Sequence, residues 1–182
     1  MGSKTPRLST AEQPADQALG PGAFQAMTGS VQPFISTVMG SLDSKGRVCI
    51  PAAYRQVLAA QNTAGLYVCP SFSETALEAF GQSLMDAVHA RLSGQDPFFS
   101  AAHDDEATAV ISRTQLLVSD DQGRVRLPDA MIEHAGLKDA VAFVGLAQKF
   151  QIWDAARYLP VQAEALARVK ARMDRARNGS GE

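Results

Sequence analysis

The sequence predicts an α+β fold built from two copies of one unit. The stretch DSKGRVCIP at 43–51 aligns without gaps with DDQGRVRLP at 120–128, and recurrence of a motif at this scale is typical of duplicated architectures. Each copy leads into a helical pattern and two further apolar runs, which is too little chain to bury an apolar face alone. We therefore expect the two copies to pack together with their hairpins interleaved, around a pseudo-two-fold axis.

The first copy begins with a β-hairpin. Residues 37–42 have a strand-like composition, and 43–46 form a turn in which Asp43 can cap the following N–H groups. Gly46 can adopt the positive φ that the chain needs to re-enter a strand. In the return strand over 47–50, the period of two directs Val48 and Ile50 to the core and the residues between them outward.

A helix and two strands complete the first copy. Pro51 stands at a favourable first helical position, and a helix of about ten residues is expected with Tyr54 and Leu58 on its inner face. An apolar strand covers 66–69. Alignment with the second copy predicts a strand over 75–80, a helix from near Gln82 to Leu92, and a longer loop around 61–74.

The second copy repeats this order with clearer signals. A strand over 113–119 enters the turn, and the helix after Pro128 ends at Gly136, a residue suited to the left-handed C-terminal cap. Strands follow over 140–144 and 149–153. Asp154 is a good N-cap for a short helix that reaches Pro160.

These signals divide the chain into five parts. The polar stretch 1–34 is expected to be disordered, because it has few large apolar residues to offset chain entropy. The first repeat covers 35–94, a linker containing a helix within 98–111 covers 95–112, and the second repeat covers 113–160. Residues 161–182 form a basic C-terminal helix and tail. A narrow apolar stripe on this helix contains Leu166, Val169 and Met173.

Composition limits the class of protein. A net charge of −2 excludes a protein that coats nucleic acid by bulk charge, but it allows a local basic surface. Cys49 and Cys69 have no metal-like spacing and sit in apolar runs, so both are expected to be small buried residues of a protein in a reducing cytoplasm. No apolar run is long enough to span a bilayer, so we expect no membrane association.

No pattern in the sequence predicts an enzyme, a cofactor or a metal site. His89, His103 and His134 are scattered, and no Gly-rich phosphate loop or His-x-x-x-His pair is present. HDDE at 103–106 is metal-like in isolation. Within a charged linker it is better interpreted as an exposed helix start.

The residues described above resemble a known family. The paired Asp-x-x-x-Arg turns, each leading to a helix-opening proline, and HAGLKDAVAFVGLAQKFQIWD at 134–154 are similar to the MraZ family of bacterial transcriptional regulators of the division and cell-wall gene cluster. The resemblance covers roughly 36–160. It implies two fused swapped-hairpin repeats of the AbrB/MazE type, with a compact β-barrel-like core and flanking helices. It also implies a closed ring of protomers at the nucleoid that binds short direct repeats of double-stranded DNA upstream of its own operon.

The resemblance places the DNA-binding residues on the two turns. The motif positions are Asp43 and Arg47 in the first copy and Asp120 and Arg124 in the second. Both aspartates are expected to cap their turns, because a carboxylate at this position accepts backbone N–H groups. An arginine at the base of a rigid hairpin can present its planar fork to guanine or to a phosphate.

The two turns are not equally charged. Lys45 adds a cation to the first turn, whereas the second turn has Asp121 and Gln122 at the matching positions of Ser44 and Lys45. We therefore expect the first turn to dominate DNA contact, with Arg126 partly compensating the second.

Two other functions stay open from the sequence. One is an antitoxin-like module in which the same fold binds a protein partner, and the other is a purely structural ring. For the arginines themselves, the alternative to DNA contact is that Asp and Arg pair only to stabilise their turns.

Overall fold

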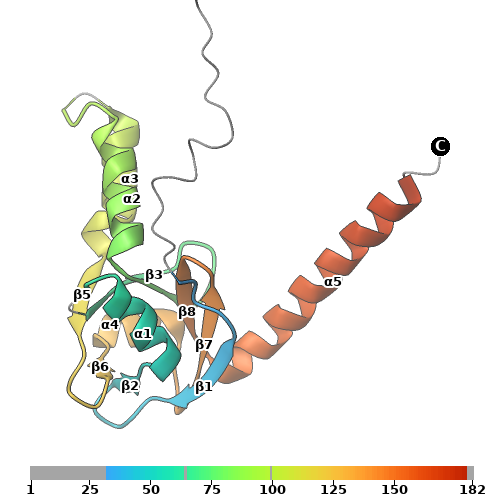
Figure 1. Ribbon diagram of the computed structural model, residues 1–182, viewed down its shortest axis with the longest axis horizontal. Helices are drawn as coiled ribbons and strands as arrows, with labels where there is room; N and C mark the ends of the chain where they lie inside the picture. Colours follow the sequence, from blue (N-terminus) through green and yellow to red (C-terminus); the bar gives the residue numbers. More distant parts are fainter. Residues whose placement is uncertain (1–31, 64, 99, 180–182) are drawn as a thin grey trace, which may run out of the picture. The chain divides into compact units, whose positions relative to one another are not determined.

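The structure is a computed structural model that describes residues 32–63, 65–98 and 100–179. A six-stranded sheet and a separate two-stranded ribbon contain all the strands of the described chain, and every pairing is antiparallel (Figure 1). In spatial order the sheet consists of β1 (Thr37–Ser41), β7 (Ala140–Leu146), β8 (Lys149–Asp154), β4 (Leu77–Phe80), β3 (Gly65–Pro70) and β5 (Gln115–Val118). The ribbon pairs β2 (Arg47–Cys49) with β6 (Arg124–Arg126).

Four of the six strand pairings join the two sequence copies, and only β3–β4 and β7–β8 lie within one copy. β1 of the first copy pairs with β7 of the second, and β5 of the second copy pairs with β3 of the first. β4 pairs with β8, and the ribbon again joins one strand from each copy. Without the other copy, each copy would keep only one of its strand pairings.

The sheet is not closed, so the prediction of a barrel-like core is wrong. β1 and β5 form the two edges of the six-stranded sheet and do not pair with each other. The physical reason is that β2 and β6 leave the sheet after the two turns and pair in a ribbon of their own, so they cannot complete a cylinder of strands.

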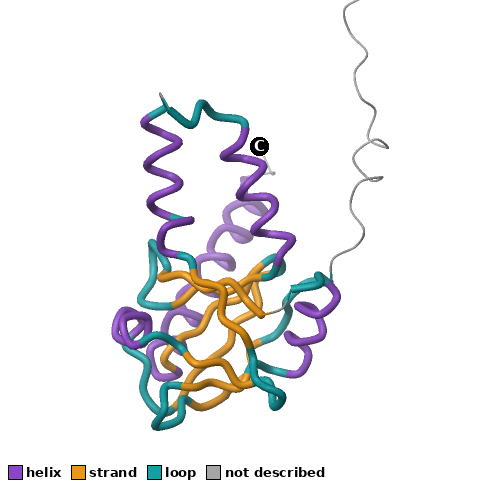
Figure 2. Tube along the Cα trace, turned by 90° about the vertical axis from the view of Figure 1, so that its left-hand side faces the viewer, coloured by secondary structure: helices purple, strands orange, loops and turns teal. Residues whose placement is uncertain are grey.

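Helices follow the ribbon strands and connect the strands of the sheet. α1 (Ala52–Ala60) and α4 (Asp129–Ala135) follow the two ribbon strands, and both begin directly after the prolines that the sequence singled out. α2 (Gln82–Ser93) and α3 (Ala101–Ala109) lie side by side and are joined by a loop (Figure 2). A 3₁₀ turn covers Ile111–Arg113, and α5 (Ala155–Gly179) ends the described chain.

Most of the expected elements are confirmed. The helix expected within 98–111 is α3, the helix from near Gln82 is α2, and Gly136 ends α4 with φ of +55°. The additional residues of the first copy lie after β3, where 71–76 form a loop, whereas a tight turn at 147–148 joins β7 to β8. The backbone N–H of Arg157 donates to Asp154 Oδ1 at 3.3 Å, which confirms Asp154 as an N-cap.

Two local predictions are wrong. Pro160 does not end a helix, because it lies inside the continuous α5. Ala155 and Tyr158 anchor the start of this helix in the core, and strong helix formers follow the proline. Cys49 is exposed, because it occupies an outward position of the ribbon, whereas Cys69 is buried as expected.

One aromatic cluster forms the centre of the core. The rings of Phe34, Tyr54 and Phe150 lie about 5 Å apart, and the Tyr54 hydroxyl donates to the backbone oxygen of Ser36 at 2.7 Å. Phe34 is buried and exchanges backbone hydrogen bonds with Ala147. Phe34 therefore belongs to the folded core and not to a disordered extension, and the remainder of the predicted extension over 1–31 lies outside the described residues.

No helix among the described residues is long and apolar enough to cross a membrane.

Candidate nucleic-acid interface

The first turn is held by one carboxylate. Asp43 Oδ1 accepts the backbone N–H groups of Lys45 and Arg47, both at 2.9 Å, and Gly46 donates to the Asp43 carbonyl at 2.9 Å. Asp43 Oδ2 accepts Arg47 Nε at 2.8 Å and lies 2.7 Å from Arg47 Nη2. Gly46 has φ of +72°, which confirms its expected role in the turn. Asp43 therefore caps the turn and also orients the arginine.

The second turn repeats this arrangement almost atom for atom. Asp120 Oδ1 accepts the N–H groups of Gln122 at 3.0 Å and Arg124 at 2.9 Å, and its Oδ2 accepts Arg124 Nε at 2.8 Å. Gly123 has φ of +77°. The predicted capping role is thus confirmed for both aspartates.

The arginine contacts lower the pKa of both carboxylates. The hydrogen bond from the Arg47 side chain, followed by that from its backbone, lowers the pKa of Asp43 from 3.8 to about 2. The backbone hydrogen bond from Arg124 is the largest cause that lowers the pKa of Asp120. Both carboxylates therefore stay ionised to a lower pH than an ordinary aspartate.

The ribbon places the arginines on one face. In its register Arg47 lies opposite Arg126, Val48 opposite Val125, and Cys49 opposite Arg124. The two valines are completely buried, so the other two pairs point away from the core. Two crossed hydrogen bonds fix the register, from Ile50 N to Gly123 O at 3.0 Å and from Leu127 N to Gly46 O at 2.9 Å.

This register changes the role expected for Arg126. Because it faces Arg47 across the ribbon, Arg126 adds its charge on the side of the first turn rather than compensating the second. Like charges placed opposite each other on a strand pair repel. An anion binding between Arg47 and Arg126 would relieve that repulsion.

Several N–H donors on this face have no hydrogen-bond partner among the described residues and can bind such a ligand. A guanidinium carries five N–H donors, and Asp43 occupies the Nε edge of Arg47, which leaves the Nη1 group without a hydrogen bond to any described residue. Lys45 and Arg126 likewise have no side-chain hydrogen bond or ion pair within the described part of the chain. The face can thus donate to several anionic or acceptor groups at once.

Arg55 is a cation near the site that the sequence did not identify. It lies on α1 but sits against Gly123 in the second turn. A signal was available, since the alignment of the copies puts Arg55, four residues after Pro51, at the position of Ile132 after Pro128. That alignment shows a difference in charge but cannot show which turn the arginine approaches.

The other candidates do not form a site. His103 contacts Asp104 in the first turn of α3, where Ser100 caps the helix. The described residues contain no group of three or more His, Cys, Asp or Glu side chains placed to hold a metal ion.

Fold and site together define a duplicated α+β protein with a basic two-stranded ribbon. A family model described as "MraZ protein, putative antitoxin-like" matches residues 110–177. A protein of Azorhizobium caulinodans named transcriptional regulator MraZ is 44% identical over 81% of this chain and 92% of its own length. Proteins of the same name from Xanthobacter autotrophicus, 43% identical over 75% of this chain and 87% of their own, and Pelagibacter ubique, 34% identical over 79% and 90%, are also similar. The chain belongs to the MraZ family.

Proposed function

We propose that this chain is a sequence-specific DNA-binding transcriptional regulator. The observation that carries the proposal is the outward face of the β2–β6 ribbon, where Arg47, Arg124 and Arg126 gather on a rigid backbone. The names of the relatives, all transcriptional regulators, support the same function. Arg47 presents its free guanidinium edge to a base or a phosphate, Lys45 contacts a phosphate, and Asp43 and Asp120 keep the arginines in position.

The proposed target is a set of short direct repeats upstream of the protein's own operon, within the division and cell-wall gene cluster. The family resemblance motivates this target. In this proposal the two repeats, 35–94 and 113–160, are swapped-hairpin units of the AbrB type, and the protein acts in the cytoplasm at the nucleoid. The pairing of strands across the two copies supports that interpretation.

A ring of protomers would give such a protein useful affinity. One protomer offers few cations, so its affinity for one repeat is low, and several linked protomers on successive repeats multiply weak contacts. An apolar surface that the other described residues leave exposed supports self-association. Leu166, Val169 and Met173 on α5 are between 38% and 68% exposed in the single chain.

The test is a titration followed by fluorescence anisotropy. Wild-type protein is added to the DNA upstream of its gene and to a matched fragment whose repeats are scrambled. Tighter binding to the intact repeats is expected, with affinity that falls steeply as salt rises. Equal affinity for both fragments would rule out sequence-specific binding. Capture of one stoichiometric protein partner with no DNA bound would favour an antitoxin-like function instead.

A further inference from the structure

The backbone of the second turn is covered by a cation from the other sequence copy. A Cβ built on Gly123 would lie 2.6 Å from Cδ and Nη1 of Arg55 and 2.8 Å from its Cζ. The guanidinium therefore rests directly on the turn. The equivalent position of the first turn is covered by an apolar side chain, since a Cβ on Gly46 would lie 3.1 Å from Cδ1 of Ile132.

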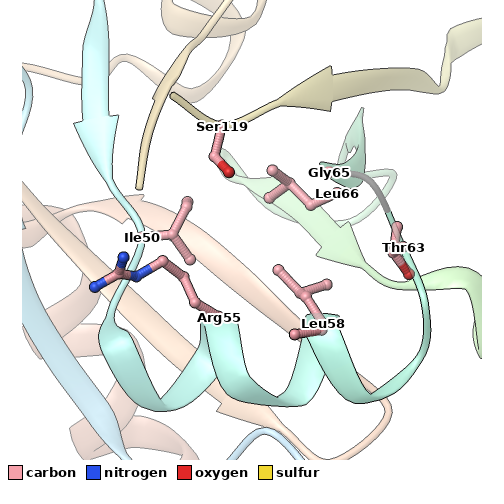
Figure 3. Close-up of a pocket in the computed structure, with 8 residues that line it drawn as sticks. Ile50, Arg55, Leu58, Thr63, Gly65, Leu66 and Ser119 are labelled. Atoms are coloured by element: carbon pink, nitrogen blue, oxygen red, sulfur yellow. The ribbon is translucent and has the colours of Figure 1, made fainter. Parts of the chain in front are cut away.

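The backbone of Arg55 is held in place by α1. Its N–H donates to the Pro51 carbonyl at 3.0 Å in the first turn of α1, and Tyr54 and Leu58 anchor that helix in the core. The aliphatic part of Arg55 lines a cavity of about 240 Å³ together with Ile50 and Leu58, and its guanidinium points away from the cavity (Figure 3).

The charged end of Arg55 is available to a ligand. Its side chain forms no hydrogen bond or ion pair with another residue in the ranges that the structure describes, and the residue is exposed. This distinguishes it from Arg47 and Arg124, each of which is paired with the aspartate of its own turn.

The second turn has few cations of its own. It has Asp121 and Gln122 at the positions of Ser44 and Lys45, and Arg124 faces Cys49 across the ribbon, where Arg47 faces Arg126. Arg55 is the cation that the fold adds there. We propose that Arg55 is a DNA phosphate-contacting residue that replaces, at the second turn, the cation which Lys45 supplies at the first.

This inference rests on the proposed function, and it assigns a phosphate rather than a base to Arg55. The side chain reaches the second turn from α1 and lies over Gly123, whereas Arg47, Arg124 and Arg126 belong to the ribbon strands themselves. A contact to phosphate carries no sequence information, so its loss weakens specific and non-specific binding alike and reduces the salt dependence.

The experiment compares R55Q and R55K with wild type on the intact and scrambled upstream DNA over a salt series. R55Q keeps much of the aliphatic stem and removes the charge, whereas R55K keeps the charge. Thermal unfolding of each variant checks that the fold is intact. For R55Q we expect binding weakened by the same factor, roughly threefold to tenfold, on both fragments, and a slope of log K against log salt reduced by about 0.9 for each engaged Arg55. R55K should retain most of the slope.

The outcomes separate this inference from the proposed function. If wild type binds the repeats and a folded R55Q has the same affinity and slope, the role of Arg55 is wrong while the regulator stands. A loss in R55Q that R55K shares, with the slope unchanged, would show a packing role and overturn the proposal. If wild type binds neither fragment, both proposals fail.

Discussion

The two turns have the same scaffold and different charges. In each, one aspartate accepts two backbone N–H groups and an arginine Nε at nearly equal distances, and a glycine adopts a positive φ. Their exposed positions differ, with Ser44 and Lys45 in the first turn and Asp121 and Gln122 in the second. The geometry of the turn thus restricts the Asp, Gly and Arg positions of the motif, whereas the two solvent-facing positions between Asp and Gly can differ.

The surroundings of the turns also differ, and each turn is contacted by residues of the other sequence copy. The first turn is covered by Ile132 of the second copy and gains Arg126 across the ribbon, whereas the second turn is covered by Arg55 of the first copy. Each turn is therefore completed by the opposite copy. A duplicated protein of this kind can tune one turn by changing residues that are distant in sequence.

The largest expected difference between the turns is in DNA affinity. Arg47→Ala should weaken binding to the repeats by about 1–3 kcal/mol, roughly fivefold to 150-fold, because a fork-like contact is lost. Arg124→Ala should cost less, since Asp121 already opposes phosphate there. Anisotropy titrations measure both, and Arg172→Ala on α5 is the control for removing one positive charge. A larger loss for Arg124→Ala would reverse the ranking of the turns.

Substitution of the two turn glycines tests how much each turn contributes to the stability of the fold. Gly46→Ala and Gly123→Ala should each lower the free energy of unfolding by about 1–2 kcal/mol, because a side chain is placed at a positive φ. Gly46→Ala is expected to cost more, since Ile132 packs against the core and Arg55 is free to move aside. Urea unfolding measures both values. An equal cost would mean that Ile132 yields as easily as Arg55.

Exchanging the charges of the turns tests their electrostatic difference. The double variant Asp121→Ser with Gln122→Lys should tighten DNA binding several-fold and steepen the salt dependence by about 0.9 for each engaged turn. The reciprocal change, Ser44→Asp with Lys45→Gln, should weaken binding. If the first pair leaves the slope unchanged, the second turn does not lie near the phosphates.

The smallest expected effect is on the pH dependence of stability. The pKa of Asp43 is lowered from 3.8 to about 2, so its contribution to stability is complete above pH 4 and is lost as the pH falls toward 2. Wild type should therefore be more stable than Asp43→Asn at neutral pH, and this advantage should shrink between pH 4 and pH 2. Thermal unfolding across this range measures it. An advantage that is as large at pH 2 as at neutral pH would contradict the assignment of Asp43.

Much of the fold was predictable from local signals. The turns, Gly136 and Asp154 each act within a few residues and are found as predicted. Both helices start at the predicted prolines, although each proline is the N-cap residue and not the first helical residue. Predictions that depended on long-range packing were less successful. Pro160 was expected to end a helix, but the buried Ala155 and Tyr158 hold the start of α5 in place.

The sequence by itself determined the duplication, the aspartate-capped turns and the residue types of the ribbon. These features depend on residue spacing and on hydrogen bonds between residues that are close in sequence. They therefore do not depend on how the rest of the chain packs. Only the tertiary structure decided that Arg126 faces Arg47, that Arg55 covers the second turn, and that the sheet stays open. Each is a contact between the two copies. Their register depends on which buried side chains, such as Val48 and Val125, meet across the core.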